Sequence, residues 1–338
     1  MTGARLATVE TALADVVDAA LEVSVVGSFS NVGIAVRRRL PGWTDPRPGV
    51  LTGSTVVITG PTSGLGRAIA WGVAALGARI LLLGRDADRL ETVRSELAAR
   101  YEDPARTRFQ CIVVDMSSGS SVDAAIRDIS AGGWAVDVVI DNAGAIHARR
   151  TITEDGLEAT IATLVIQPFR LVAGLLASLR RSGHGQVIAI ASGGMYAQAL
   201  RLDDLGLAHG AYDGVRTYAR AKRAQVALIR EWARRFGGEG LRFDAMHPGW
   251  ADTRGLREAL PRFRAVMRPL LRDASQGADT AVWLAAGGAA DRPTGQLYLD
   301  RRARPFDRVP WTRLGPTARR ELWDRVVELS GIAPPRLG

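Results

Sequence analysis

Three residue types are scarce in this chain of 338 residues: cysteine, lysine and asparagine. Cys111 is the one cysteine, so no intrachain disulfide can form and a cysteine-based metal site is excluded. Lys222 is the one lysine among 44 basic residues, and the asparagines are Asn31 and Asn142. The four histidines lack the spacing of metal ligands, so we expect no metal site. Because arginine serves elsewhere as the cation, the lone lysine indicates a position that needs a compact ammonium group.

Long apolar runs are also scarce. None approaches the roughly 20 residues of a membrane-spanning helix, and acidic residues interrupt the N-terminus where a signal peptide would be apolar. We therefore expect a cytoplasmic protein. The net charge of +9 could suit nucleic acid, but the arginines are spread along the chain and no nucleic-acid-binding motif is present. Solubility, an anionic cofactor or an acidic membrane surface explains the charge better.

From residue 54 onwards, short apolar segments alternate with helical ones, which predicts βαβ units and a parallel sheet. We expect one doubly wound, three-layer α/β Rossmann domain over residues 51–300. A helical extension and linker precede it (1–50), and an Arg-rich tail with one helix follows it (301–338). The predicted strands are 54–59, 79–83, 108–114, 136–141, 186–191, 241–246 and 296–299. The predicted helices are 9–21, 64–76, 86–100, 121–129, 153–181, 214–236 and 316–329.

The N-terminal extension allows two interpretations. Residues 23–36 are apolar but interrupted by small polar residues, and three arginines follow at 37–39. One interpretation is a helical segment packed on the main domain. The alternative is a peripheral membrane contact, because arginines beside an apolar helix suit an anionic surface.

The turn after the first strand reads Thr59-Gly-Pro-Thr-Ser-Gly-Leu-Gly66 and opens a helix. Its glycines permit a tight turn, and the free N–H groups and dipole of a helix start attract a pyrophosphate. No Gly-Lys-Ser/Thr follows, which excludes a nucleotide-hydrolysing P-loop. The predicted dinucleotide contacts here are Gly60, Thr62, Ser63, Gly64, Leu65 and Gly66.

The ends of the next strands extend this predicted cofactor site. Arg85 follows the second strand, where an arginine suits the 2′-phosphate of NADP(H), so NADP(H) is preferred over NAD(H). Asp86 is explained more simply as a helix N-cap. Asp115 and Met116 follow the third strand as candidate adenine contacts, although a helix-entry cap explains Asp115 equally well. The fourth strand leads into a further turn of small residues, Asn142, Ala143 and Gly144.

The predicted chemistry centres on Tyr218 and Lys222, which lie one helical turn apart and share a helix face. An ammonium group beside a phenol favours the phenolate and lowers a pKa that starts near ~10. Tyr218 is therefore the predicted general acid or base.

These motifs together resemble the short-chain dehydrogenase/reductase family. The glycine turn, Asn142-Ala-Gly144, Ser192, Tyr218-x3-Lys222 and Pro248-Gly249 occur in its order and spacing, over residues 54–300. Longer stretches, including 192–196 and 247–253, are similar to one branch of the family.

The resemblance implies an oxidoreductase that interconverts an alcohol and its carbonyl compound with NADP(H). Ser192 would hydrogen-bond the substrate oxygen and Tyr218 would exchange a proton with it. Lys222 would depress the tyrosine pKa and hold the nicotinamide ribose. Further contacts to the nicotinamide would come from Pro248, Gly249, Trp250 and Thr253.

One position departs from the family pattern, because alignment on residues 153–158 places Leu164 where an asparagine is usual. Pro168, four residues later, has no N–H to donate to the Leu164 carbonyl. We hypothesise that this carbonyl is free to bind a relay water. The alternative function is a redox-sensing NADP-binding protein of the same fold with weak or no turnover.

The substrate side should be formed by residues 195–216 and 254–273, which are largely apolar and favour a lipophilic alcohol or carbonyl compound. His147 is explained better as a surface histidine than as a pocket residue. Family enzymes commonly dimerise through the long helices, here 153–181 and 214–236, so a homodimer is a further expectation. The predicted substrate contacts are Met195, Tyr196, Tyr212 and Trp250.

Overall fold

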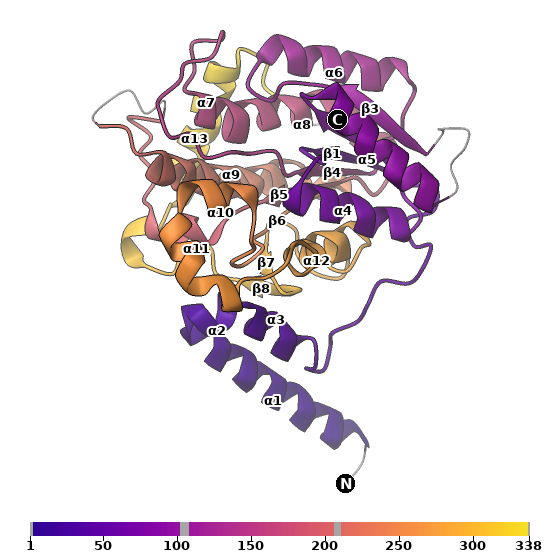
Figure 1. Ribbon diagram of the computed structural model, residues 1–338, viewed down its shortest axis with the longest axis vertical. Helices are drawn as coiled ribbons and strands as arrows, with labels where there is room; N and C mark the ends of the chain where they lie inside the picture. The colour runs from indigo at the N-terminus through magenta and orange to yellow at the C-terminus, as the bar shows by residue number, and fades with distance from the viewer. Residues whose placement is uncertain (1–2, 102–107, 206–210, 337–338) are drawn as a thin grey trace.

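The computed structural model describes residues 3–101, 108–205 and 211–336, and eight strands of this part of the chain form one sheet (Figure 1). The strand order is β3-β2-β1-β4-β5-β6-β7-β8; β1 to β7 are parallel, and β8 is antiparallel to β7. The order reverses between β1 and β4, and ligands of such sheets bind at the carboxyl ends of the strands beside this point. The predicted doubly wound α/β fold is confirmed.

Strands β1 to β7 coincide with the short apolar runs of the sequence, and β8 does not. The strands are β1 Thr55–Thr59, β2 Arg79–Gly84, β3 Phe109–Val113, β4 Val138–Asp141, β5 Gln186–Ile190, β6 Arg242–Met246, β7 Leu297–Leu299 and β8 Arg302–Arg304. The central strands β1 and β5 are buried along their whole length, as strands covered on both faces should be. Strand β8 was not predicted, because its arginines give no apolar pattern.

Helices cover both faces of the sheet, and each face has its own apolar cluster. One layer contains α4 (Gly64–Ala75), α5 (Ala87–Arg100) and α12 (Ala274–Ala285). The other contains α6 (Gly119–Ala131), α8 (Gln167–Arg181) and α9 (Gly214–Phe236). The sequence did not predict α12. The long helix predicted within about 153–181 begins at α7 (Ala159–Ile161), and a π-helix over Ala162–Ile166 joins α7 to α8.

The helix that spans Ala159–Arg181 is long and apolar enough to cross a membrane, which the sequence reading did not anticipate. However, 78% of its apolar window is buried inside the protein. Such burial is typical of a core helix in a layered fold. The length and composition of this helix are therefore only weak evidence for a membrane span.

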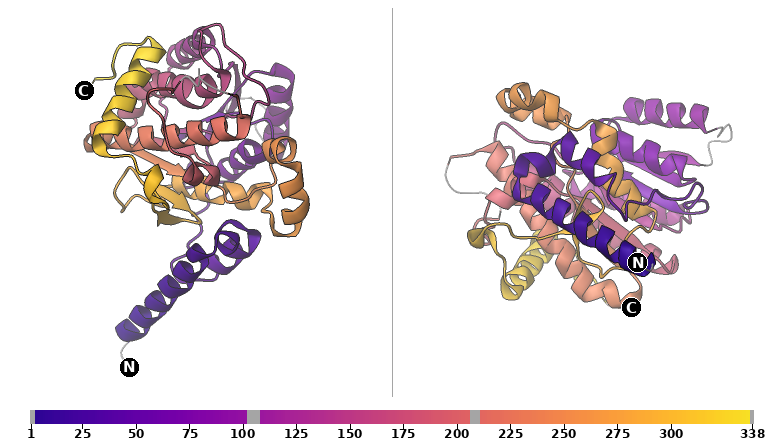
Figure 2. Two further views of the ribbon diagram at one scale, coloured as in Figure 1. Left: turned by 90° about the vertical axis from the view of Figure 1, so that its left-hand side faces the viewer. Right: turned by 90° about the horizontal axis from the view of Figure 1, so that it is seen from below.

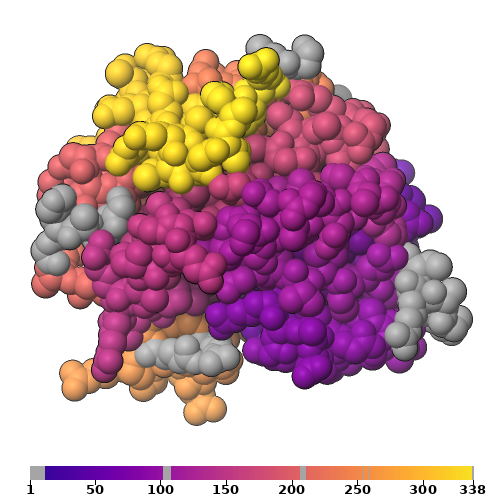
Figure 3. All heavy atoms as spheres, turned by 90° about the horizontal axis from the view of Figure 1, so that it is seen from above, coloured from indigo at the N-terminus to yellow at the C-terminus, as the bar shows by residue number. Residues whose placement is uncertain are grey.

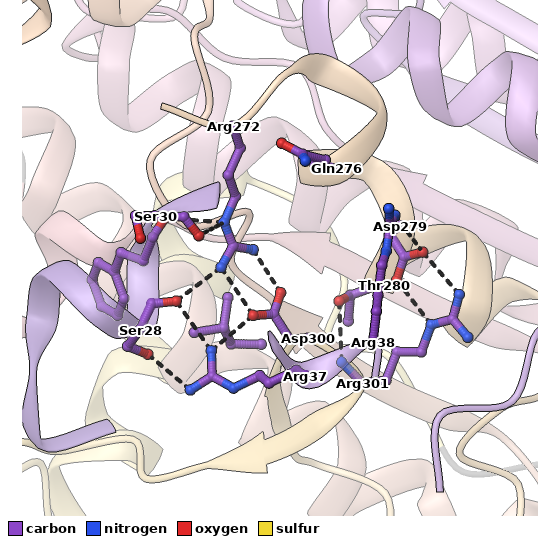
Figure 4. Close-up of polar contacts among 12 residues, drawn as sticks. Ser28, Ser30, Arg37, Arg38, Arg272, Gln276, Asp279, Thr280, Asp300 and Arg301 are labelled. Carbon is purple, nitrogen blue, oxygen red and sulfur yellow. Dashed lines mark hydrogen bonds and ion pairs between the residues drawn. The ribbon is translucent and has the colours of Figure 1, made fainter. Parts of the chain in front are cut away.

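The N-terminal extension forms α1 (Gly3–Val23), α2 (Val25–Phe29) and α3 (Asn31–Arg37). Helix α1 projects from the body of the molecule, as Figure 2 shows. Buried ion pairs attach α2 and α3 to the sheet (Figure 4): Asp300 lies 2.8 Å from Arg37 Nη1 and 2.6 Å from Arg272 Nη1. The prediction of a helical segment packed on the main domain is confirmed, and a buried charge cluster contributes to its anchor.

The C-terminal tail ends in α13 (Pro316–Ser330), close to the helix predicted over residues 316–329. Its Trp323 packs against Phe169 of α8 and Trp232 of α9, with ring centroids 4.9 and 4.7 Å away. In Figure 3 the C-terminal residues lie across the surface of the neighbouring segments. The tail therefore covers part of the two long helices through which a homodimer was expected.

Candidate active site

The glycine turn lies between β1 and α4, at the carboxyl edge of the sheet. Gly60 has a φ of +66° and Gly64 a φ of +52°, in the left-handed region that favours glycine. A Cβ on Gly66 would lie 2.1 Å from the Gly60 carbonyl oxygen, so a side chain there would displace the turn. No described atom lies within 4 Å of the Cβ position of Gly64, and Ser63 forms no side-chain cap on α4. The helix start is thus an open backbone cradle, which fits the pyrophosphate of a dinucleotide.

Asn142 holds the glycine turn in place. Its Nδ2 donates to the carbonyl oxygens of Thr59 (2.9 Å) and Gly60 (3.1 Å). The backbone N–H groups of Asn142 and Ala143 both donate to Thr59 Oγ1 at 2.9 Å. The predicted turn at 142–144 therefore lies against the glycine turn. The Asn142 side-chain amide stabilises the backbone cradle through its hydrogen bonds to the protein rather than to a ligand.

The ends of β2 and β3 carry the other predicted cofactor contacts. Arg85 is exposed at the edge of the sheet. Asp86 caps α5 by accepting from the Arg89 N–H at 3.0 Å. Asp115 Oδ1 accepts from the N–H and hydroxyl of Ser117 at 2.8 and 2.7 Å, which matches the alternative of a helix-entry turn. Met116 is buried in the core, so its side chain has little surface to offer an adenine.

Ser192 and Tyr218 meet at the same edge of the sheet. Ser192 follows β5, and its Oγ accepts from the N–H of Gly194 at 3.3 Å. Tyr218 lies in the first turns of α9. Burial raises the pKa of Tyr218 to about 12, while its side-chain hydrogen bond to Ser192 acts in the opposite direction.

Lys222 lies one turn further along α9, with its Nζ 5.8 Å from the Tyr218 ring centroid. The ammonium donates to the carbonyl oxygen of Ile190 (2.6 Å) and to Gln225 Oε1 (3.1 Å). Burial lowers the pKa of Lys222 to about 8, and the charge of Asp141 opposes this shift. In this structure burial of the phenol outweighs any lowering of the Tyr218 pKa by Lys222, and the ammonium is bound by other acceptors, so the predicted effect of Lys222 on Tyr218 stays a prediction.

The position of the missing asparagine lies in the π-helix. Leu164 is fully buried, and a Cβ on Gly144 would lie 2.6 Å from its Cδ2, so Leu164 packs against the Asn-Ala-Gly turn. Pro168 can donate neither to the Leu164 carbonyl in an α-helical register nor to the Thr163 carbonyl in a π-helical one. π-helices are frequent at functional sites. The relay-water hypothesis for Leu164 stays a prediction.

The N-terminal extension contacts the loop after β6. The sequence did not predict this contact. The backbone N–H of Trp250 donates to the Phe29 carbonyl oxygen at 2.8 Å. The Phe29 ring lies 5.9 Å from the Trp250 ring, and a Cβ on Gly193 would lie 2.5 Å from Phe29 Cε2. Phe29 thus contacts both predicted pocket loops, the one after Ser192 and the one after Pro248. Thr253 caps α10 (Arg254–Ala259) by accepting from the Leu256 N–H at 3.3 Å.

The predicted substrate residues divide into two groups. Met195 and Tyr196 are packed in the core at 0% and 7% exposure, and the Tyr196 hydroxyl donates to the Pro305 carbonyl at 3.0 Å. Both side chains are therefore largely shielded from solvent, and their contact with a substrate stays a prediction. Tyr212 and Trp250 are half-buried and keep accessible surface. Residues 206–210 of the predicted pocket segment lie outside the described part of the chain.

The sheet order, the backbone cradle at the start of α4 and the convergence of Ser192, Tyr218 and Lys222 define a dinucleotide-binding oxidoreductase of the Rossmann type. The family model for short chain dehydrogenases matches residues 54–262. The chain belongs to the short-chain dehydrogenase/reductase family, whose members act on CH–OH groups with NAD(P).

Relatives support this assignment over most of the chain. Human dehydrogenase/reductase SDR family member 12 is 35% identical over 253 residues, which cover 75% of this chain and 78% of the relative. Mouse retinol dehydrogenase 14 is 31% identical over 298 residues, 84% of this chain and 88% of the relative. A crystal structure of an uncharacterized protein from Mycobacterium paratuberculosis has a TM-score of 0.68 at 26% identity, covering 87% of this chain and 100% of that one. The family and branch suggested by the sequence motifs are confirmed.

Proposed function

We propose that this protein interconverts a lipophilic alcohol and its carbonyl compound with NADP(H), and that Tyr218 transfers the proton. The observation that carries the proposal is that Tyr218 lies beside Ser192, whose hydroxyl group acts to lower the Tyr218 pKa, with the only lysine of the chain one helical turn away. These three side chains lie at the carboxyl edge of the sheet, beside the backbone cradle of the glycine turn.

Each residue has a distinct role in this proposal. Ser192 would hold the substrate oxygen by a hydrogen bond, and Tyr218 would exchange a proton with that oxygen. The nicotinamide, when bound, supplies or accepts the hydride. With a pKa of about 12, Tyr218 is protonated at neutral pH, so the free protein is prepared to act as a general acid. This protonation state suits carbonyl reduction.

Replacement of the phenol hydroxyl tests the proposal. Tyr218→Phe should lower turnover of hydrophobic aldehydes or ketones with NADPH by at least ~100-fold, because it removes the general acid. NADPH binding by the variant should be nearly unchanged. Tyr101→Phe is the matched control, since Tyr101 follows the last residue of α5 and packs against Trp71 and Phe109, with ring centroids 6.1 and 6.4 Å away. Full turnover by Tyr218→Phe would exclude Tyr218 as the proton donor.

The proposed preference for NADP(H) depends on Arg85. Its side chain is exposed after β2 and forms no ion pair with any residue that the structure describes. A free guanidinium group there can bind a 2′-phosphate in a bidentate manner. The pyrophosphate would bind the backbone of residues 60–66, and the turn at 142–144 would border the nicotinamide side.

The alternative proposal is a redox-sensing NADP-binding protein with weak or no turnover. Leu164 favours it, because an apolar side chain occupies the position where the family usually carries an asparagine. Tight NADPH binding by the wild type, together with no turnover across a broad carbonyl series, would support this alternative over the enzyme.

The proposed lipophilic substrate rests on two observations. Trp250 is half-buried and packs edge-on against Phe263 at 5.3 Å, which gives the loop after β6 an apolar wall. In addition, retinol dehydrogenase 14 bears the name of a lipophilic alcohol. A series of linear aldehydes of increasing length should therefore show increasing kcat/KM.

We further propose that the protein is cytoplasmic and contacts an acidic membrane surface through α1. The helix exposes Leu13 (63%), Val16 (65%) and Val23 (88%). Val16→Ser combined with Val23→Ser should reduce sedimentation with vesicles of acidic phospholipid. Removal of the whole extension is a poorer test, because it would also remove Arg37, which pairs with Asp300, and the carbonyl groups that accept hydrogen bonds from Arg272. Equal sedimentation of the variant and the wild type would exclude this contact.

A further inference from the structure

A buried carboxylate that the proposed reaction does not use lies next to the catalytic lysine. Asp141 ends β4 and is only 4% exposed. Its Oδ2 accepts a hydrogen bond from Gln225 Nε2, and Gln225 Oε1 accepts from Lys222 Nζ at 3.1 Å. Gln225 therefore bridges the two charged groups, and both ends of its amide are used.

The two charges affect each other in the directions expected of a buried pair. Burial raises the pKa of Asp141 to about 6, and the charge of Lys222 opposes that shift. Burial lowers the pKa of Lys222 to about 8, and the charge of Asp141 opposes that shift in turn. Between about pH 6 and pH 8 both groups are charged, and the charge of each stabilises the charged form of the other.

Asp141 also contacts the frame of the cofactor cradle. The Thr59 side chain hydrogen-bonds Asp141, while Thr59 Oγ1 accepts the backbone N–H groups of Asn142 and Ala143. One carboxylate thus joins the Asn-Ala-Gly turn to the lysine. Among the described residues, no hydrogen-bond partner reaches its second oxygen, Oδ1.

We propose that Asp141 is a positioning residue, which acts through Gln225 to keep Lys222 protonated and oriented at the active site. An ammonium group has three donors, and the Ile190 carbonyl and Gln225 take two of them. The third is then available for a ribose hydroxyl. Leu164 of the π-helix has no polar side chain for the lysine to bind. The side-chain hydrogen bond that holds Lys222 is therefore with Gln225 on α9, which is itself bound to Asp141 at the end of β4.

The single lysine makes the proposal directly measurable. Full-length protein grown with lysine that carries 13C at the ε-carbon gives one lysine signal, provided that any purification tag is lysine-free. Its chemical shift, followed against pH, reports the protonation of Lys222. Tyr218 is the other titratable group beside the ammonium, so the titration is repeated in Tyr218→Phe to assign the transition.

The wild type should titrate near pH 8, and Asp141→Asn should move the midpoint down by about one pH unit or more, because burial remains and the opposing charge is gone. Asp137→Asn is the matched control. Asp137 is also buried, four residues earlier, but it binds the Thr55 N–H at 2.7 Å and faces His184. Its midpoint should stay at the wild-type value. An unchanged midpoint in Asp141→Asn would overturn the proposal.

A second variant keeps the proposal testable if Asp141→Asn fails to fold. Gln225→Leu removes the bridge and one acceptor of the ammonium but retains the carboxylate, and it should also lower the Lys222 midpoint. An unchanged midpoint in Gln225→Leu would overturn the bridging role. The catalytic role of Asp141 and Lys222 rests on the proposed function, whereas the titration of Lys222 needs no substrate. A failure of the proposed function and a failure of the positioning proposal can therefore be told apart.

If the wild type turns over a carbonyl substrate, the same variants have a kinetic signature. The alkaline limb of the pH profile of kcat should move to lower pH in Asp141→Asn and stay in place in Asp137→Asn. A uniform loss of activity at every pH, with an unshifted limb, would indicate a structural role only and would also overturn the proposal.

Discussion

Replacement of Asp18 on α1 is the strongest test of the ion pairs that attach the N-terminal extension to the sheet. Its Oδ1 lies 2.6 Å from Arg37 Nε and its Oδ2 lies 2.7 Å from Arg304 Nη1, so it joins the extension to β8. Burial alone would raise the pKa of Asp18, but the hydrogen bonds and charges of Arg304 and Arg37 outweigh it and lower the pKa from 3.8 to about 2.

The magnitude follows from this shift. One pKa unit corresponds to about 1.4 kcal/mol, so the ionised Asp18 contributes about 2–3 kcal/mol to the free energy of unfolding near neutral pH. Because the folded-state pKa is the lower one, this contribution is present above the unfolded value of 3.8 and is lost as the pH falls towards 2. Asp18→Asn should therefore lower the free energy of unfolding by about 2–3 kcal/mol at pH 7, and by about half of that near pH 3.

Urea unfolding at both pH values measures the effect. Asp15→Asn is the matched control on the same helix, because Asp15 is 65% exposed and its ion pair with Arg302 is solvated. Such exposed pairs contribute about 0–1 kcal/mol. The reasoning is refuted if Asp18→Asn costs no more than Asp15→Asn, or if the difference from wild type persists unchanged as the pH falls.

Three further substitutions test the packing around the site. Gly66→Ala should weaken NADPH binding at least ~10-fold, because its Cβ would lie 2.1 Å from the Gly60 carbonyl; Gly238→Ala, which has open space, should bind normally by the same titration. Phe29→Ala should lower the free energy of unfolding by about 3–5 kcal/mol in urea, as truncation of a large buried aromatic side chain does. A loss below about 1 kcal/mol would mean that the contact of Phe29 with the Trp250 loop contributes little to stability. Trp323→Ala should cost a similar ~3–5 kcal/mol by removing the contact of α13 with α8 and α9, and native mass spectrometry of the variant reports whether the uncovered face self-associates.

Local patterns in the sequence were sufficient for the sheet and for the principal site residues. Parallel strands buried on both faces are apolar throughout, so β1 to β7 appear as short apolar runs. The glycine turn and the Tyr218–Lys222 pair are also local, since each depends on residues within one turn of a helix or loop.

What the sequence did not predict depends on residues far apart in the chain. Phe29 contacts the Trp250 loop, and Arg37 meets Asp300, only because the extension folds back on the sheet. Burial raises the pKa of Tyr218, an effect that the spacing of residues along α9 does not reveal. Likewise, the partner of Lys222 is Asp141 at the end of β4, which no spacing within α9 could indicate.

The direct test of the central claim is a calorimetric titration of the purified full chain with NADPH and, separately, with NADH, repeated with Arg85→Ala. The account predicts tighter binding of NADPH, and a loss of at least ~10-fold in NADPH affinity in Arg85→Ala with NADH affinity nearly unchanged. Tighter binding of NADH would contradict the role of Arg85 and leave the catalytic residues in place. Failure to bind either dinucleotide would contradict the proposed function as a whole.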